Sequence, residues 1–267
     1  MSRKATLVSL YGPKRDAEFA KLVKECQNAV KADIPGFIPY DMKQIHATII
    51  GLEHQDSTDQ KIGPFLNDNF KRLRKQNTEM DLDGLFLFLR NCGLFPLEVQ
   101  IGGFENREYP FRSRDTQPSE RTFSIQNDRV VLMGWPVRGK PLLSAPQDPL
   151  ASLQEARLYP STLDMIRHAA QRYGVLHGYH GALTDVDNDL FFRIGLIGGA
   201  LPTARKLRAV ERTLRDYLSS PPPLIIEIRL NDVRVAVYDD NTLPTATTKH
   251  ISLNDPLLTQ QWVVQQL

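Results

Sequence analysis

Short stretches of this sequence alternate apolar and polar residues, whereas longer stretches place apolar residues every three or four positions. Residues 5–10 and 45–52 follow the first pattern, which is typical of a β-strand with one buried face. Residues 16–32 follow the second pattern and are predicted to form an amphipathic helix. In the stretch 45–52, His46 and Thr48 are two positions apart and therefore point to the same side of the predicted strand.

Further strands and helices follow along the chain. The sequence predicts strands over 85–90, 97–102, 123–135, 190–198, 224–230 and 234–238, and helices over 60–75, 161–173, 203–218 and 256–266. We expect the last two strands to pair with each other through a tight turn at Asn231-Asp232.

The order of these elements repeats. Residues 5–104 run strand, helix, strand, helix and strands, and residues 129–238 follow the same order. Two such halves predict an α+β fold with two pseudo-symmetric βαβ-type lobes, whose curved antiparallel sheets flank a central cleft. His46 in the first half and Arg193 in the second would then face each other across this cleft.

We expect a single two-lobed domain. Lobe 1 covers about 5–128, lobe 2 about 129–240, and 241–267 form a C-terminal extension. With 267 residues, 41% of them hydrophobic and 24% charged, the chain can bury a large core and has an ordinary globular composition. No apolar run is long enough to cross a membrane and no signal-type segment begins the chain. A cytoplasmic protein without a membrane partner is therefore expected.

The charge and the cysteines narrow the choice of ligand. A net charge of +2 gives no broad basic surface, so any anion must be bound by a local cluster. Cys26 and Cys92 lie in different segments without CxxC spacing, so the cysteines indicate neither a zinc site nor a disulfide framework. The common glycine-rich nucleotide loops are also missing. We predict no cofactor and no metal ion.

His46 and Thr48 are the leading candidates for chemistry. An imidazole can transfer a proton, and a neighbouring hydroxyl can hold a phosphoryl oxygen. The alternative is that His46 is an ordinary strand residue whose ring finds a hydrogen bond. The rest of the chain has to decide between these two interpretations.

The segment 46–51, His-Ala-Thr-Ile-Ile-Gly, together with the repeated order of elements over 5–240, resembles the 2H phosphoesterase superfamily. This group includes the RNA 2′,3′-cyclic phosphodiesterases, also called 2′-5′ RNA ligase-like proteins. The resemblance implies that His46 is a general base or acid and that Thr48 holds the phosphate. It also implies substrate-binding roles for Tyr238, because the family's closing strand commonly ends near a tyrosine, and for Tyr11.

The second half departs from the pattern of that family. Members that turn over substrate carry an HxT/S motif in each lobe, so that one histidine takes a proton and the other donates one. Here the second motif reads Arg193-Ile194-Gly195. Arg193 can bind phosphoryl oxygens two at a time, but it cannot donate a proton near neutrality. Another group would have to supply the proton.

Three histidines are candidates for that role. His180 and His177 lie in a Gly-rich connection before the strand at 190–198, and His180 is the leading candidate. His250 starts a His-x-Ser sequence, but it follows the repeat and is expected to lie outside the cleft. His168 lies on a predicted helix and is expected to be solvated.

Two charged segments remain. The polar loop 106–121 carries Arg112, Arg114 and Arg121 among aromatic residues, and it could close over a phosphate and a base. The alternative for this loop is a solvated surface excursion. Asp185, Asp187 and Asp189 lack the glycine and closing glutamate of an EF-hand and are expected to form a solvated turn.

The sequence therefore leaves more than one function open. The first is a metal-independent phosphodiesterase or cyclic phosphodiesterase that acts on RNA ends or small (cyclic) nucleotides. The second is a catalytically degenerate module that keeps its phosphate contacts and binds a nucleotide or an RNA end. A scaffold protein without a ligand is the third. The oligomeric state is not indicated.

Overall fold

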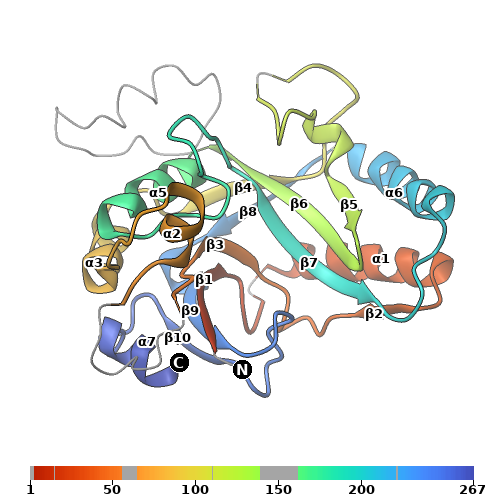
Figure 1. The fold of residues 1–267 in the computed structure, drawn as a ribbon. Helices are drawn as coiled ribbons and strands as arrows, with labels where there is room; N and C mark the ends of the chain where they lie inside the picture. Colours follow the sequence, from red (N-terminus) through yellow and green to blue (C-terminus); the bar gives the residue numbers. More distant parts are fainter. Residues whose placement is uncertain (1–2, 15, 56–64, 110, 139–161, 221) are drawn as a thin grey trace.

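Two antiparallel sheets form the body of the molecule (Figure 1), a computed structural model that describes residues 3–14, 16–55, 65–109, 111–138, 162–220 and 222–267. Sheet A has the strand order β10 (Lys249–Ser252), β9 (Val233–Tyr238), β1 (Lys4–Ser9) and β3 (Ala47–Gly51). Sheet B has the order β2 (Phe37–Pro39), β7 (Leu190–Ile197), β6 (Arg129–Arg138), β4 (Leu97–Ile101) and β8 (Leu224–Ile228), and β5 (Phe123–Gln126) pairs with β6. The predicted α+β class with curved antiparallel sheets is confirmed.

Helices cover these sheets from several sides (Figure 1). They are α1 (Ala17–Asp33), α2 (Asp68–Arg74), α3 (Leu82–Asn91), α5 (Thr162–Ala170), α6 (Ala204–Ser219) and α7 (Gln260–Gln266). Short 3-10 turns lie at Pro118–Glu120, Gln171–Tyr173 and Leu230–Asp232. Most of these helices begin at a side chain that accepts a backbone N–H of the first turn, which satisfies an otherwise unpaired donor: Asp16, Asn67, Asp81, Thr203 and Thr259.

Successive side chains of each strand point to opposite faces of its sheet, so each sheet has one face toward the main core and one face away from it. On one face of sheet A, Leu7, Ile49 and Val235 point into the main hydrophobic core, where Phe19 and Val23 of α1 are also buried. The opposite faces of the two sheets carry smaller apolar clusters. The cluster on sheet A consists of Val8, Tyr11, Ala236 and Leu243, and the cluster on sheet B of Phe104, Val131, Met133 and Trp135.

The two sheets do not follow the predicted division of the chain at residues 128 and 129. Sheet A combines β1 and β3 from the first half with β9 and β10 from the end of the chain. Sheet B takes β2, β4 and β5 from the first half and β6, β7 and β8 from the second. Each sheet is therefore built from both halves of the sequence.

Two predicted strands have a different form. Residues 85–90 lie within helix α3, because Leu82, Leu85, Phe86 and Leu89 are buried at helical spacing and Asp81 caps the first turn. The predicted strand 123–135 is a hairpin of β5 and β6, which turns at Asn127 in a left-handed conformation with φ 58°.

The predicted pairing of the last two strands is wrong. β8 pairs with β4 in sheet B, whereas β9 pairs with β1 and β10 in sheet A. Residues 230–232 form a 3-10 turn that carries the chain from one sheet to the other. β8 and β9 each pair with a strand that is far away in the sequence, so the residues of the turn between them could not predict their pairing.

Candidate functional site

The two sheets meet where β3 of sheet A contacts β7 of sheet B. β3 is an edge strand, and β7 is the second strand of its sheet. His46 immediately precedes β3, and Arg193 lies on β7, so this contact brings the two residues close enough for the guanidinium charge to lower the pKa of the imidazole. The sequence predicted that these two residues lie near each other across a cleft; the structure brings them close together, and the cleft itself stays a prediction.

His46 is buried and hydrogen-bonded at this junction. Its side chain is 5% exposed, and its Nδ1 lies 2.7 Å from the carbonyl oxygen of Gln44. Because a carbonyl can only accept, Nδ1 carries the proton and the lone pair is on Nε2. Burial lowers the pKa of His46 to about 4, the hydrogen bond to Gln44 opposes this shift, and the charges of Arg193 and Lys14 add to it. The ring is therefore neutral at pH 7.

Arg193 has few partners for a guanidinium in this position. It is partly buried, and its Nη1 donates a hydrogen bond of 3.1 Å to the carbonyl of Asn241. Among the described residues it makes no ion pair with a carboxylate, and Arg129 is a further cation in its surroundings. A guanidinium without an acidic partner has N–H groups left for a bound anion.

Phenols and a hydroxyl line the same junction. The charge of Arg193 influences Tyr40 and Tyr238, and burial raises the pKa of both phenols, to about 12 for Tyr238. Both therefore keep an O–H that can be donated to an anion. Thr48 pairs with Val8 of β1, and both point away from the main core. Asp128 and Asp240 also lie near Tyr40, so the junction is not uniformly basic.

Lys14 is a further cation beside His46. Its ammonium group donates to the carbonyls of Leu10 and Ile45. Burial lowers the pKa of Lys14 to about 7, and the carboxylate of Asp41 opposes this shift. Near neutrality the amine is thus present in both its charged and neutral forms.

The connection between β9 and β10 covers part of this face of sheet A. Leu243 is buried against Val8, Tyr11 and Ala236, and its carbonyl accepts a hydrogen bond of 3.0 Å from the Tyr11 hydroxyl. Tyr11 itself is 2% exposed. The connection between β9 and β10 therefore covers Tyr11 and takes up its hydroxyl, so the predicted contact of Tyr11 with a substrate is blocked in this structure.

His250 lies on β10, within sheet A and not beyond it. Its ring centroid is 5.2 Å from that of Tyr11, and the Tyr11 centroid is 5.9 Å from that of His46. Tyr11 thus contacts both imidazoles. No strand was predicted at 249–252, so the contact between His250 and Tyr11 was not anticipated from the sequence.

The arginines of the loop 106–121 are engaged with the protein. Arg121 lies 3.3 Å from a carboxylate oxygen of Asp189, and Arg114 lies 3.7 Å from the same oxygen. The Arg114 guanidinium also stacks on the Tyr179 ring at 3.7 Å. Arg112 is exposed and lies 3.4 Å from Glu108. Arg114 and Arg121 therefore anchor the loop, and a role in closing over a phosphate requires them to leave Asp189.

The predicted solvated turn is buried at two of its three acidic positions. Asp189 accepts hydrogen bonds of 2.7 Å from both Ser113 and the Trp135 indole, and Asp187 lies 3.2 Å from Arg167. Arg167 keeps the pKa of Asp187 below its usual range against the opposing effect of burial. These carboxylates are buried because arginines from distant segments of the chain neutralise their charge, and the local sequence does not contain these partners.

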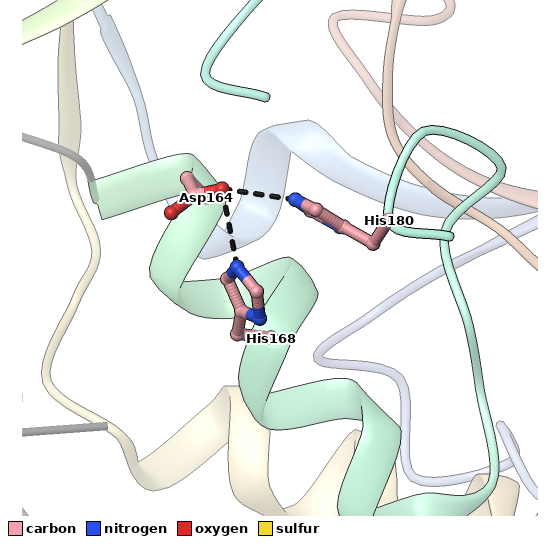
Figure 2. A group of neighbouring side chains, drawn as sticks. All are labelled: Asp164, His168 and His180. Carbon is pink, nitrogen blue, oxygen red and sulfur yellow. Dashed lines mark hydrogen bonds and ion pairs between the residues drawn. The ribbon is translucent and has the colours of Figure 1, made fainter. Parts of the chain in front are cut away.

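His180 lies in a second polar cluster (Figure 2). It is fully buried, and its Nε2 is 2.9 Å from Oδ1 of Asp164 on α5. His168, predicted to be solvated, is 5% exposed and points to the same carboxylate. His177 is held at 3.1 Å by Asp187. With no exposed surface, His180 cannot reach a leaving group at the junction of the sheets in this conformation.

The sequence contained one signal for this second cluster. Asp164 and His168 are one helical turn apart, so they lie on the same face of α5. The partner His180 comes from a loop, and no periodic pattern identifies such a contact.

No family model matches this chain, and a search of curated proteins finds no match. In the described part of the chain, no helix combines the length and the apolar character that crossing a membrane requires.

Proposed function

We propose that the protein binds a phosphate group of an RNA end or a small nucleotide at the junction of the two sheets. The observation that carries the proposal is the partly buried guanidinium of Arg193, which makes no carboxylate ion pair among the described residues and lies near enough to the neutral ring of His46 to lower its pKa. A phosphate would complete the hydrogen bonding of Arg193. Tyr238, Tyr40 and Thr48 would add O–H donors to this phosphate.

A binding role is favoured over turnover by the position of the histidines. Two-histidine phosphodiester chemistry needs a second imidazole across the phosphate from the first. In this chain the second motif of the sequence begins with Arg193, His180 is buried with Asp164, and His250 packs against the Tyr11 ring, which also contacts His46.

The test is binding of adenosine 2′,3′-cyclic monophosphate and adenosine 3′-monophosphate, with adenosine as the uncharged control. Arg193→Met keeps the length of the side chain and removes the donors, so it should weaken phosphate binding roughly 10–100-fold. Arg205→Met, on the exposed face of α6, is the matched control and should bind like the unchanged protein. Equal affinity of both nucleotides and adenosine, or an unchanged affinity of Arg193→Met, would refute the proposal.

A metal-independent phosphodiesterase is the second candidate. The neutral His46 with its lone pair on Nε2 is in the protonation state of a general base, and the neighbouring Lys14, with a pKa of about 7, has the protonation equilibrium of a general acid. Hydrolysis of the cyclic nucleotide in the presence of a chelator would favour it. His46→Asn should then lower the rate roughly 10²–10⁴-fold. Binding of the cyclic nucleotide without formation of any product would instead support the binding role.

A further inference from the structure

Asp164, His168 and His180, here called the α5 cluster, gather three potential metal ligands away from the proposed phosphate site (Figure 2). Asp164 and His168 project from the same side of α5, and His180 reaches them from the loop that follows. All three side chains are buried, with exposures of 0%, 5% and 0%. Such a group of imidazoles around one carboxylate has either a hydrogen-bonding role or a metal-binding role.

The distances fit one small ion. Oδ1 of Asp164 is 2.9 Å from Nε2 of His180 and 3.6 Å from Nε2 of His168, and one donor atom from each residue lies within 4.8 Å of the others. Tetrahedral ligands about 2.0–2.1 Å from a zinc ion are separated from each other by about 3.3 Å. The two separations from Asp164 lie on either side of this value, and the two imidazole nitrogens are at most 4.8 Å apart, so small side-chain movements would let the three atoms share an ion.

We propose that the α5 cluster binds one divalent transition-metal ion, of which Zn²⁺ is the best match, and that the ion has a structural role. Two imidazole nitrogens and one carboxylate oxygen suit Zn²⁺ or Fe²⁺, whereas Mg²⁺ and Ca²⁺ select oxygen ligands. Burial on all sides favours a structural ion over a catalytic one, because a catalytic ion keeps a position open for substrate.

Neighbouring groups can complete the coordination. The carbonyl oxygen of Asp185 is 3.0 Å from Nε2 of His168 and accepts a hydrogen bond when that nitrogen carries the proton; with the proton on Nδ1, the same carbonyl is placed to become a fourth ligand. The side-chain amide of Gln171 is 3.2 Å from Nδ1 of the same ring. With the amide oxygen turned to this nitrogen, Gln171 accepts the Nδ1 proton and leaves the Nε2 lone pair for the ion.

The ion would fix α5 to the loop that carries His180. α5 also carries Arg167, which donates to the carbonyls of Thr48 and Ile49 in β3. Metal binding would therefore stabilise the support behind the β3 strand without taking part in phosphate binding. The proposal does not depend on the proposed function, because its test measures the ion directly.

The first experiment uses the full chain after treatment with a chelator and dialysis. Zn²⁺ should bind at one ion per chain with a Kd of about 1 μM or below, measured by competition with a chromophoric chelator. Saturation should raise the thermal midpoint by roughly 5–10 °C. Co²⁺ should give the visible absorption of a four-coordinate site with nitrogen and oxygen ligands. Mg²⁺ is the control ion, and it should neither bind at this site nor raise the thermal midpoint.

Variants assign the site. Asp164→Asn and His168→Gln should each weaken Zn²⁺ binding by at least the roughly 10–100-fold that loss of an outer-shell partner causes, whereas His250→Gln, at an exposed imidazole, should bind like the unchanged protein. If the buried variants do not fold, nitrogen NMR of the unchanged chain decides: Zn²⁺ should shift the ring signals of His168 and His180 and leave His250 unaffected. Absence of one-to-one binding, or a shift confined to His250, overturns the proposal.

Discussion

Arg167 and Arg193 carry the same charge in very different surroundings. Arg167 is 1% exposed, lies 3.2 Å from the carboxylate of Asp187, and donates to the carbonyls of Thr48, Ile49, Asp187 and Asp189. Arg193 is partly exposed and donates to one carbonyl, that of Asn241. A guanidinium has five N–H donors, so the first is nearly saturated by protein and the second is not.

This contrast separates a structural cation from a candidate ligand-binding cation. The desolvation of Arg167 is compensated within the folded protein, so its removal would leave Asp187 buried without its strongest partner. Arg193 has donors left over, and only an added anion or water can use them. We therefore expect the guanidinium of Arg167 to stabilise the fold and that of Arg193 to bind a ligand.

The largest expected effect is on Arg167. Arg167→Met should destabilise the protein by roughly 3–5 kcal/mol, because it leaves a buried carboxylate and several carbonyls unsatisfied. Chemical denaturation measures the change, with Arg205→Met as an exposed control that should stay within about 0.5 kcal/mol. A loss below about 1 kcal/mol for Arg167→Met would contradict the structural role.

Acid should weaken the fold through His46. Because its pKa is about 4 in the folded protein and 6.5 when unperturbed, the unfolded chain takes up a proton first as the pH falls. The stability that the neutral ring contributes is complete above pH 6.5 and declines toward pH 4, by roughly 3 kcal/mol. His46→Asn, whose amide can still donate to Gln44, should show a smaller decline. An equal slope for both proteins would place the acid sensitivity elsewhere.

Asp189 tests whether the arginines of the loop 106–121 are structural. Asp189→Asn keeps the acceptor for Ser113 and Trp135 but removes the charge that holds Arg114 and Arg121. The expected loss of stability is about 2 kcal/mol, with faster hydrogen exchange across the loop. Asp115→Asn, at an exposed position of the same loop with φ 63°, is the control and should exchange as before.

The smallest effect on stability is expected at Arg193. Arg193→Met loses one hydrogen bond and removes a partly buried charge, so unfolding free energy should change by less than about 1 kcal/mol in either direction. The same variant should lose phosphate affinity, as proposed above. A loss of several kcal/mol would erase the distinction between the two arginines, since it would give Arg193 a structural role as well.

Local patterns in the sequence predicted the elements that bury one face. Helix α1 with its Asp16 cap, the strands β1, β7 and β9, and helix α6 all follow apolar periodicity, and their positions are close to those predicted. The juxtaposition of His46 and Arg193 was expected from the repeated order of elements. Residues 85–90 were assigned to the wrong class because a short apolar run fits a strand as well as a buried helix.

Local patterns in the sequence could not predict which polar side chains are buried. Asp187, Asp189 and His168 are typical surface residues by type, and their burial depends on Arg167, Arg121 and Asp164. Arg167 and Arg121 come from segments tens of residues away from their carboxylates, so no short window of sequence contains both members of these two interactions. For the same reason the pairing of β8 with β4 could not be deduced from the turn at 230–232. Asp164, one helical turn before His168, is the one partner that a local pattern does contain.

The sequence by itself determined most of the segments that become helices and strands and the α+β class, and it predicted that an imidazole and a guanidinium come close together. Side-chain periodicity fixes these features because it is a local property of the backbone. Only the tertiary structure decided which charges are satisfied: it saturated Arg167, left Arg193 with unused donors, and collected Asp164, His168 and His180 at one point. Electrostatic compensation inside a protein depends on distances between atoms in space, and these distances follow from the packing of the whole chain.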